Sequence, residues 1–131
     1  LAQNTTYYKT DIVAAYNKHM MFAVPEEICD FPGIGFVEGM ACGCAYFGLD
    51  DPMYRDIGLI PGIHYIAHDG TVSDLMAKVR YYQNNIDGLK IIAKSGNEFV
   101  TNKLTQASVY STFFALLKTK LTDKQNSIRQ S

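Results

Sequence analysis

The sequence predicts an α/β fold in which a short parallel sheet of about three strands precedes a helical C-terminal part. Apolar runs of strand length alternate with segments of helical periodicity through the first half of the chain, and this alternation favours parallel strands joined by helical crossovers. The second half shows helical periodicity alone. A length of 131 residues can bury one sizeable core, so we expect a single domain or a piece of a larger one.

The composition is that of an ordinary globular chain, with 47% hydrophobic and 19% charged residues. These values exclude disordered and low-complexity classes. Twelve Lys and Arg against thirteen Asp and Glu give a net charge of -1, so no basic field favours nucleic acid as a partner. No apolar run approaches the ~18 residues of a membrane span, and the N-terminus lacks a signal-peptide pattern. We therefore expect a cytoplasmic location.

The first predicted elements are a helix and a strand. Residues 7–19 carry apolar side chains at helical spacing, and Thr5 and Thr6 before them can cap a helix start. The five-residue apolar run 20–24 ends at a proline and is too short for another helix. It fits a short buried strand.

A loop, a helix and a second strand follow. The segment 25–35 is polar and bears glycines, so we expect a loop there. Helical spacing then runs from Ile34 until Gly43 stops it. The apolar run 44–49 predicts a second strand that is buried on both faces.

The remaining elements are one strand and three helices. Residues 64–68 lie between strong turn signals and predict a third strand. Thr71 opens a helix with a variant of the capping box and one apolar stripe. Two further helices are predicted over 89–104 and 108–121, and the polar segment 123–131 is predicted to be a flexible tail.

The chemistry of the chain is expected in the loop and helix after the first strand. Gly33 and Gly35 stand where backbone N–H groups at a helix start could approach a phosphate. Glu38 is an acidic residue in an apolar run, and a carboxylate accepts well from the paired hydroxyls of a ribose. The alternative is a first-turn glutamate that the helix dipole stabilises, and spacing alone leaves both interpretations open.

This region resembles a known family. Asp30 and Glu38 stand eight apart with Gly33 between them, and Glu38 opens the run Glu-Gly-Met-Ala-Cys-Gly-Cys-Ala. It is similar to the signature of GT-B glycosyltransferases of the group 1 type, which use nucleotide-sugar donors. The turn at 58–62 and the strand and helix after it resemble the end of the same Rossmann-like, C-terminal donor domain. The similarity covers about residues 23–100.

The resemblance implies a role for each residue of the segment. Glu38 would bind the ribose hydroxyls of the donor. Asp30 would reach the donor sugar or its diphosphate and is the candidate catalytic residue. Backbone N–H groups of Gly33, Ile34 and Gly35 would contact the phosphates. A nucleoside diphosphate would leave the anomeric carbon of the sugar, with its charge stabilised by a helix dipole and basic side chains instead of a metal, and no cofactor is implied.

The resemblance also implies a missing partner. Members carry an acceptor domain upstream, and Leu1 is not an initiator Met, so we expect residues 1–122 to be the C-terminal portion of a donor-binding domain. The N-terminal acceptor domain would be its partner, and this chain alone would not catalyse transfer. The full-length enzyme could be peripheral to a membrane. The alternative function is a non-catalytic nucleotide-binding or assembly module, and a purely structural α/β domain is a third interpretation.

Two other features of the sequence bear on function. Cys42 and Cys44 could supply two zinc ligands, but a structural site needs four and the histidines are scattered, so buried thiols are favoured and no metal is expected. A wide apolar band on the last helix would be exposed in this chain alone and could drive formation of a homodimer. The band consists of Phe113, Phe114, Leu116 and Leu117.

Overall fold

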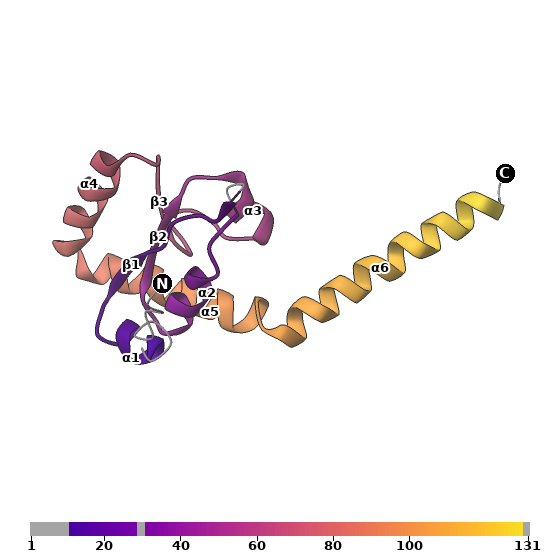
Figure 1. Ribbon diagram of the computed structural model, residues 1–131, viewed down its shortest axis with the longest axis horizontal. Coiled ribbons are helices and arrows are strands. Elements are labelled where there is room, and N and C mark those ends of the chain that lie inside the picture. Colours follow the sequence, from indigo (N-terminus) through magenta and orange to yellow (C-terminus); the bar gives the residue numbers. More distant parts are fainter. Residues whose placement is uncertain (1–10, 29–30, 130–131) are drawn as a thin grey trace, which may run out of the picture.

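The computed structural model describes residues 11–28 and 31–129, with side chains through residue 125, and shows an α/β fold. Its sheet has three parallel strands in the order β1-β2-β3 (Figure 1). They are β1 (Met21–Ala23), β2 (Ala45–Leu49) and β3 (Ile66–His68). The predicted fold class and the three predicted strands are confirmed.

Six helices surround or extend the sheet in the described residues. Three predicted helices match the structure closely, the first is shorter than predicted, the last is longer, and one was not predicted. The helices are α1 (Ile12–Tyr16), α2 (Gly35–Ala41), α3 (Pro52–Ile57), α4 (Val72–Gln83), α5 (Ile86–Lys103) and α6 (Gln106–Arg129). The polar segment that was predicted to be a tail thus continues α6 as far as Arg129.

In the described part of the first predicted helix, residues 7–19, the structure has the shorter α1, and residues 7–10 of the prediction lie outside the described residues. Asp11 is extended, with φ -73° and ψ 98°, and its side chain accepts a hydrogen bond of 3.0 Å from Ala14 N. An N-cap of this kind begins a helix at the next residue, Ile12. The predicted caps Thr5 and Thr6 lie outside the described residues.

Helix α3 was not predicted, although its ends carry clear signals. The Asp51 side chain accepts a 2.7 Å hydrogen bond from Met53 N, and Pro52 occupies the first turn. Gly58 ends the helix in the left-handed region at φ 100°. A helix of six residues is too short to show an apolar stripe, so only these terminal residues could have revealed it.

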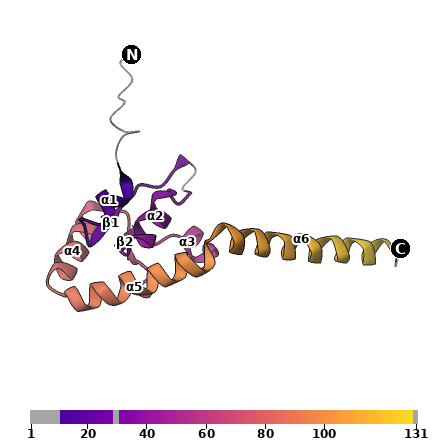
Figure 2. The same ribbon diagram turned by 90° about the horizontal axis from the view of Figure 1, so that it is seen from below.

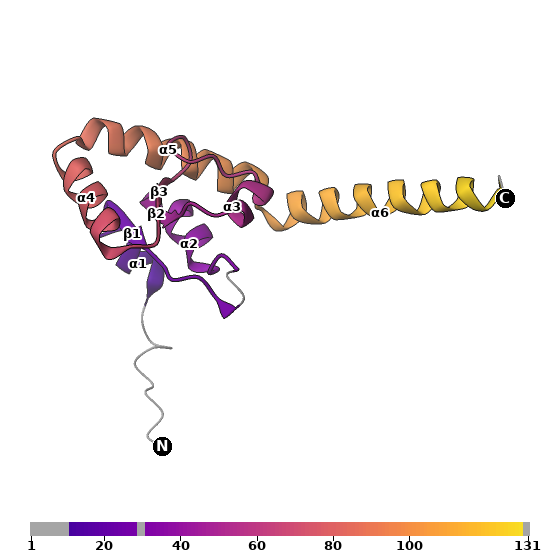
Figure 3. The same cartoon turned by 90° about the horizontal axis from the view of Figure 1, so that it is seen from above.

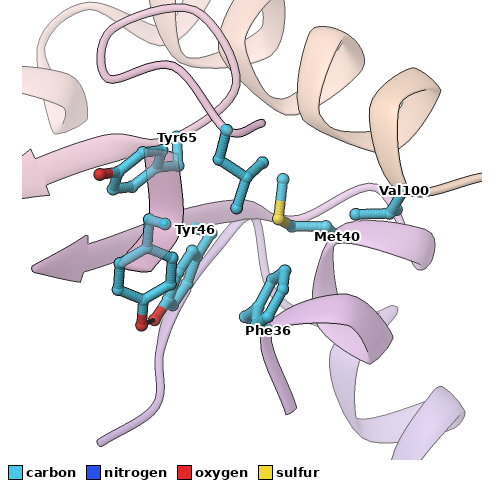
Figure 4. Close-up of a cluster of buried hydrophobic side chains, with 7 residues drawn as sticks. Phe36, Met40, Tyr46, Tyr65 and Val100 are labelled. Carbon is cyan, nitrogen blue, oxygen red and sulfur yellow. Dashed lines mark hydrogen bonds between the residues drawn. The ribbon is translucent and has the colours of Figure 1, made fainter. Parts of the chain in front are cut away.

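The core lies on both faces of β2. Tyr46 points to the side of α2 and α3, whereas Ala45 and Phe47 point to the side of α4, and α5 crosses beneath both. The predicted burial of this strand on both faces is confirmed. One cluster contains Phe36, Met40, Tyr46, Tyr54, Leu59, Tyr65 and Val100 (Figure 4). The other contains Ala45, Phe47, Ile66, Leu89 and Ile92.

Helix α6 leaves this body at the end of α5 and projects away from it, as three views agree (Figures 1, 2 and 3). Its apolar band is exposed as predicted, with Phe113 at 56% and Phe114 at 62% of their full accessible surface. Of the helices in the described residues, none combines the length and apolar content of a membrane span.

Candidate functional site

The carboxyl ends of the three strands meet at one edge of the sheet, where open α/β sheets bind their ligands. The segment after β1 leads into α2, the segment after β2 leads into α3, and the segment after β3 leads into α4. The charged side chains described in these segments are all acidic. They are Glu26, Glu27, Asp50, Asp51 and Asp69. Arg55 of α3 is a basic residue beside them, and its guanidinium pairs with the Asp50 carboxylate.

The turn into α2 is tightly packed, and its first amides have no acceptor among the described residues. Gly33 is buried, and a Cβ atom there would lie 2.6 Å from Pro25 O, so the close approach requires glycine. Phe36 N is the first amide of the turn to donate, to Gly33 O at 3.0 Å. Within the described part of the chain, the N–H groups of Gly33, Ile34 and Gly35 meet no protein acceptor. These are the residues that were predicted to contact phosphate.

Glu38 lies one turn further along α2 and is exposed. The helix buries Phe36, Gly39 and Met40 against the core, and Glu38 stands on the opposite face. Ile34 precedes it by four residues and so lies on the same side of the helix. No ion pair or hydrogen bond joins its carboxylate to another described residue. Asp30, the candidate catalytic residue, lies outside the described residues.

The structure adds three residues that the sequence did not indicate. The Tyr54 hydroxyl donates to Glu26 Oε1 at 3.0 Å, and the Tyr46 and Tyr54 hydroxyl oxygens are 2.6 Å apart. Burial is the main cause that raises the pKa of both phenols above the ordinary tyrosine value. Both therefore remain protonated donors at neutral pH. They come from β2, α3 and the segment after β1, so no local pattern could have predicted their contact.

Cys44, His64 and His68 have structural hydrogen-bond partners. Cys44 is buried, and its thiol donates to Tyr16 O at 3.2 Å and to His19 O at 3.1 Å. The Nδ1 atom of His64 accepts from Ile60 N, and that of His68 accepts from Gly70 N. Among the described residues, no group of three or more His, Cys, Asp and Glu side chains could hold a metal ion.

The comparison with protein families places this parallel α/β unit among the glycosyltransferases. A family model described as Glycosyl transferase family 90 matches residues 39–130, which is more than half of the chain. The chain belongs to this family. The match supports glycosyl transfer in general and does not distinguish the group 1 type that the sequence resembles. Among curated proteins, none matches this chain.

The segment that matches the family model and the predicted site are adjacent in the sequence and do not overlap. The match begins at Gly39, directly after Glu38, so the candidate residues Gly33, Ile34, Gly35 and Glu38 precede it. The match includes β2, β3 and the helices from α3 onward. The roles of Gly33, Ile34, Gly35 and Glu38 in donor binding therefore stay predictions.

Proposed function

We propose that this chain is the donor-binding part of a family 90 glycosyltransferase with GT-B architecture, and that it binds a nucleoside diphosphate sugar at the carboxyl edge of the sheet. The observation that carries the proposal is the start of α2. Three consecutive amides without a described acceptor stand there at the end of β1, and an unpaired carboxylate follows on the same side of the helix. Family membership supplies the reaction class.

Each group has a defined chemical task in this proposal. The amides of Ile34 and Gly35 donate to the diphosphate, whose negative charge grows as it leaves the anomeric carbon. The Glu38 carboxylate accepts from two ribose hydroxyls, and such bonds to a charged acceptor are stronger than neutral ones. Asp30 is proposed to reach the donor sugar or its diphosphate. No step of this transfer requires a metal ion or a further cofactor.

The acceptor is proposed to bind to an N-terminal acceptor domain outside this segment. Arg55 supports this division, because its guanidinium already pairs with Asp50 and the charged side chains described in the segments after the strands are acidic. Groups that neutralise the leaving diphosphate would come from that partner domain. The same observation favours a second candidate function, a non-catalytic module that binds a nucleotide without transferring a sugar.

A titration of the chain with UDP, GDP and ADP, followed by backbone amide shifts, tests the proposal. We expect shifts centred on residues 33–38, with the preferred base identified by the tightest binding. Glu38→Ala should weaken binding by about 1–3 kcal/mol, the scale of hydrogen bonds to a charged group. Glu98→Ala is the matched control, because Glu98 is also an exposed helical glutamate and its contact with Lys94 is long, at 3.9 Å.

Two results would count against donor binding at this edge. Equal affinities of wild-type chain and Glu38→Ala would remove Glu38 from the site. Loss of the folded state in Glu38→Ala would show that the residue stabilises α2 instead. Binding without any sugar transfer, even when the acceptor domain is present, would favour the non-catalytic module.

A further inference from the structure

The hydroxyls of two buried tyrosines form a directed chain that ends on Glu26. Each phenol has one proton to donate. Tyr54 gives its proton to Glu26 Oε1 at 3.0 Å, so the proton in the 2.6 Å contact between the two hydroxyls comes from Tyr46. Both tyrosines are fully buried, whereas Glu26 is only partly buried. The chain therefore links the rigid centre of the fold to the segment that follows β1.

Glu26 lies in the first part of the segment after β1, and this part packs against the start of α2. Its neighbour Pro25 approaches Gly33 so closely that a Cβ atom on Gly33 would lie 2.6 Å from Pro25 O. Its other neighbour, Glu27, donates its backbone N–H to Phe31 O at 2.7 Å. Fixing Glu26 thus restrains Pro25, which contacts Gly33, and Glu27, which is bonded to Phe31 just before the turn. The amides of this turn are those that have no acceptor among the described residues.

The same two tyrosines also hold the other end of the turn. The Phe36 ring, in the first turn of α2, stacks on Tyr46 with ring centroids 5.8 Å apart (Figure 4). It meets Tyr54 edge-on at 5.9 Å. The two tyrosines therefore contact the chain on both sides of the turn 33–35, at Glu26 through the hydrogen bond of Tyr54 and at Phe36 through ring packing.

We propose that Tyr54, acting through Glu26, is a positioning residue that sets the backbone geometry of the turn 33–35 for the donor diphosphate. This inference rests on the proposed function, because it assigns a purpose to the same turn. Tyr54 and Glu26 do not contact the donor in this scheme. Hydrogen-bonding groups must be held within a few tenths of an ångström to act on a ligand, and the phenol chain supplies that restraint.

Tyr65 provides a matched control for the Tyr54 substitution, because it is a buried phenol of the same cluster that does not bond to Glu26. It is fully buried and packs on both tyrosines, with ring centroids 5.4 Å from Tyr54 and 6.1 Å from Tyr46. Its hydroxyl donates instead to Leu49 O at 3.1 Å, at the end of β2. Tyr65→Phe and Tyr54→Phe both remove a buried phenol hydroxyl from the same cluster, but only Tyr54→Phe releases Glu26.

The first measurement needs no ligand. Amide shifts and hydrogen exchange are compared between wild-type chain, Tyr54→Phe and Tyr65→Phe. We expect Tyr54→Phe to shift the amides of residues 31–36 and to speed their exchange, while Tyr65→Phe leaves them near their wild-type values. Equal changes in the two variants, or none in Tyr54→Phe, would overturn the inference.

The second measurement is nucleotide affinity. Tyr54→Phe should raise the dissociation constant of the preferred nucleoside diphosphate roughly threefold or more, as expected for a lost hydrogen bond, and Tyr65→Phe should not change it. Unchanged affinity in Tyr54→Phe, with weakened affinity in Glu38→Ala, would overturn the positioning role and leave the proposed function intact. No nucleotide binding by the wild-type chain would overturn both, whatever the first measurement shows.

Two variants of Glu26 distinguish a positioning role of this residue from a direct effect of its charge. Glu26 is only partly buried, so these variants leave the core side chains unchanged. Glu26→Gln keeps an oxygen that can accept from Tyr54, so it should bind nucleotide like the wild-type chain. Glu26→Ala should reproduce the weakened binding of Tyr54→Phe. Equal weakening in Glu26→Gln and Glu26→Ala would mean that the charge of Glu26 acts directly, which would overturn the inference.

Discussion

Three buried tyrosines, Tyr46, Tyr54 and Tyr65, couple the stability of this fold to alkaline pH. Burial raises the pKa of Tyr65 to about 12 and raises the pKa of the other two as well, from an ordinary value of 10.0. Above pH 10 the unfolded chain loses phenol protons that the folded chain keeps. The free energy of unfolding should therefore be insensitive to these groups at neutral pH and fall as pH rises from about 10 to 12.

Urea unfolding followed by circular dichroism between neutral pH and pH 12 checks this expectation. Tyr65→Phe removes one titrating phenol, so its stability should fall less steeply over the alkaline range than that of the wild-type chain. A wild-type unfolding free energy that stays constant through the alkaline range would contradict the role of the three phenols.

At the scale of elements, α5 depends on a close approach at Gly96. A Cβ atom there would lie 2.4 Å from His64 O and 2.6 Å from Met40 Cε. The next residue, Asn97, donates its side-chain amide to Met40 O and Ala41 O, both at 2.9 Å, so the same contact supports the end of α2. The backbone carbonyl of His64 cannot move away as a flexible side chain could.

Gly96→Ala should therefore destabilise the chain by about 1–3 kcal/mol, the usual cost of overpacking. In an exposed helix the same change would stabilise by about 1 kcal/mol, because alanine favours helix more than glycine does. Lys94→Ala, on the exposed side of α5, should change stability by no more than about 0.5 kcal/mol. The measurement is the urea midpoint, and a Gly96→Ala chain more stable than wild type would contradict the packing argument.

At this scale, the sequence could predict those features whose interactions join residues close together in the chain. The apolar runs and capping residues act locally, so the strands and the helix after Thr71 were predicted, and the Thr71 side chain does accept from Asp74 N at 3.1 Å. The contact of Tyr54 with Glu26 joins residues 28 apart and left no local signal. The sequence thus predicted the local residues of the site, 33–38, and the bond that we propose to position them is visible only in the structure.

At the scale of the whole molecule, α6 stands apart from the rest. Neither core cluster of the described residues contains a side chain from α6. Its base borders a groove of about 390 Å³ together with α3 and the end of α5, at Ile57, Phe99 and Leu104. Beyond that groove its apolar band faces outward, with Leu116 at 59% and Leu117 at 42% exposed. The homodimer predicted through this band stays a prediction.

Deletion of residues 106–131 separates folding from association. Because the core lies in the preceding body, the shortened chain should keep its fold, with an unfolding free energy within about 1 kcal/mol of the full chain at low concentration. If the band pairs two copies, the full chain should sediment as a dimer and the shortened chain as a monomer. The double variant Phe113→Ser and Leu117→Ser should then be folded and monomeric at full length. Unfolding of the shortened chain would show that α6 belongs to the core, and a monomeric full chain would refute the homodimer.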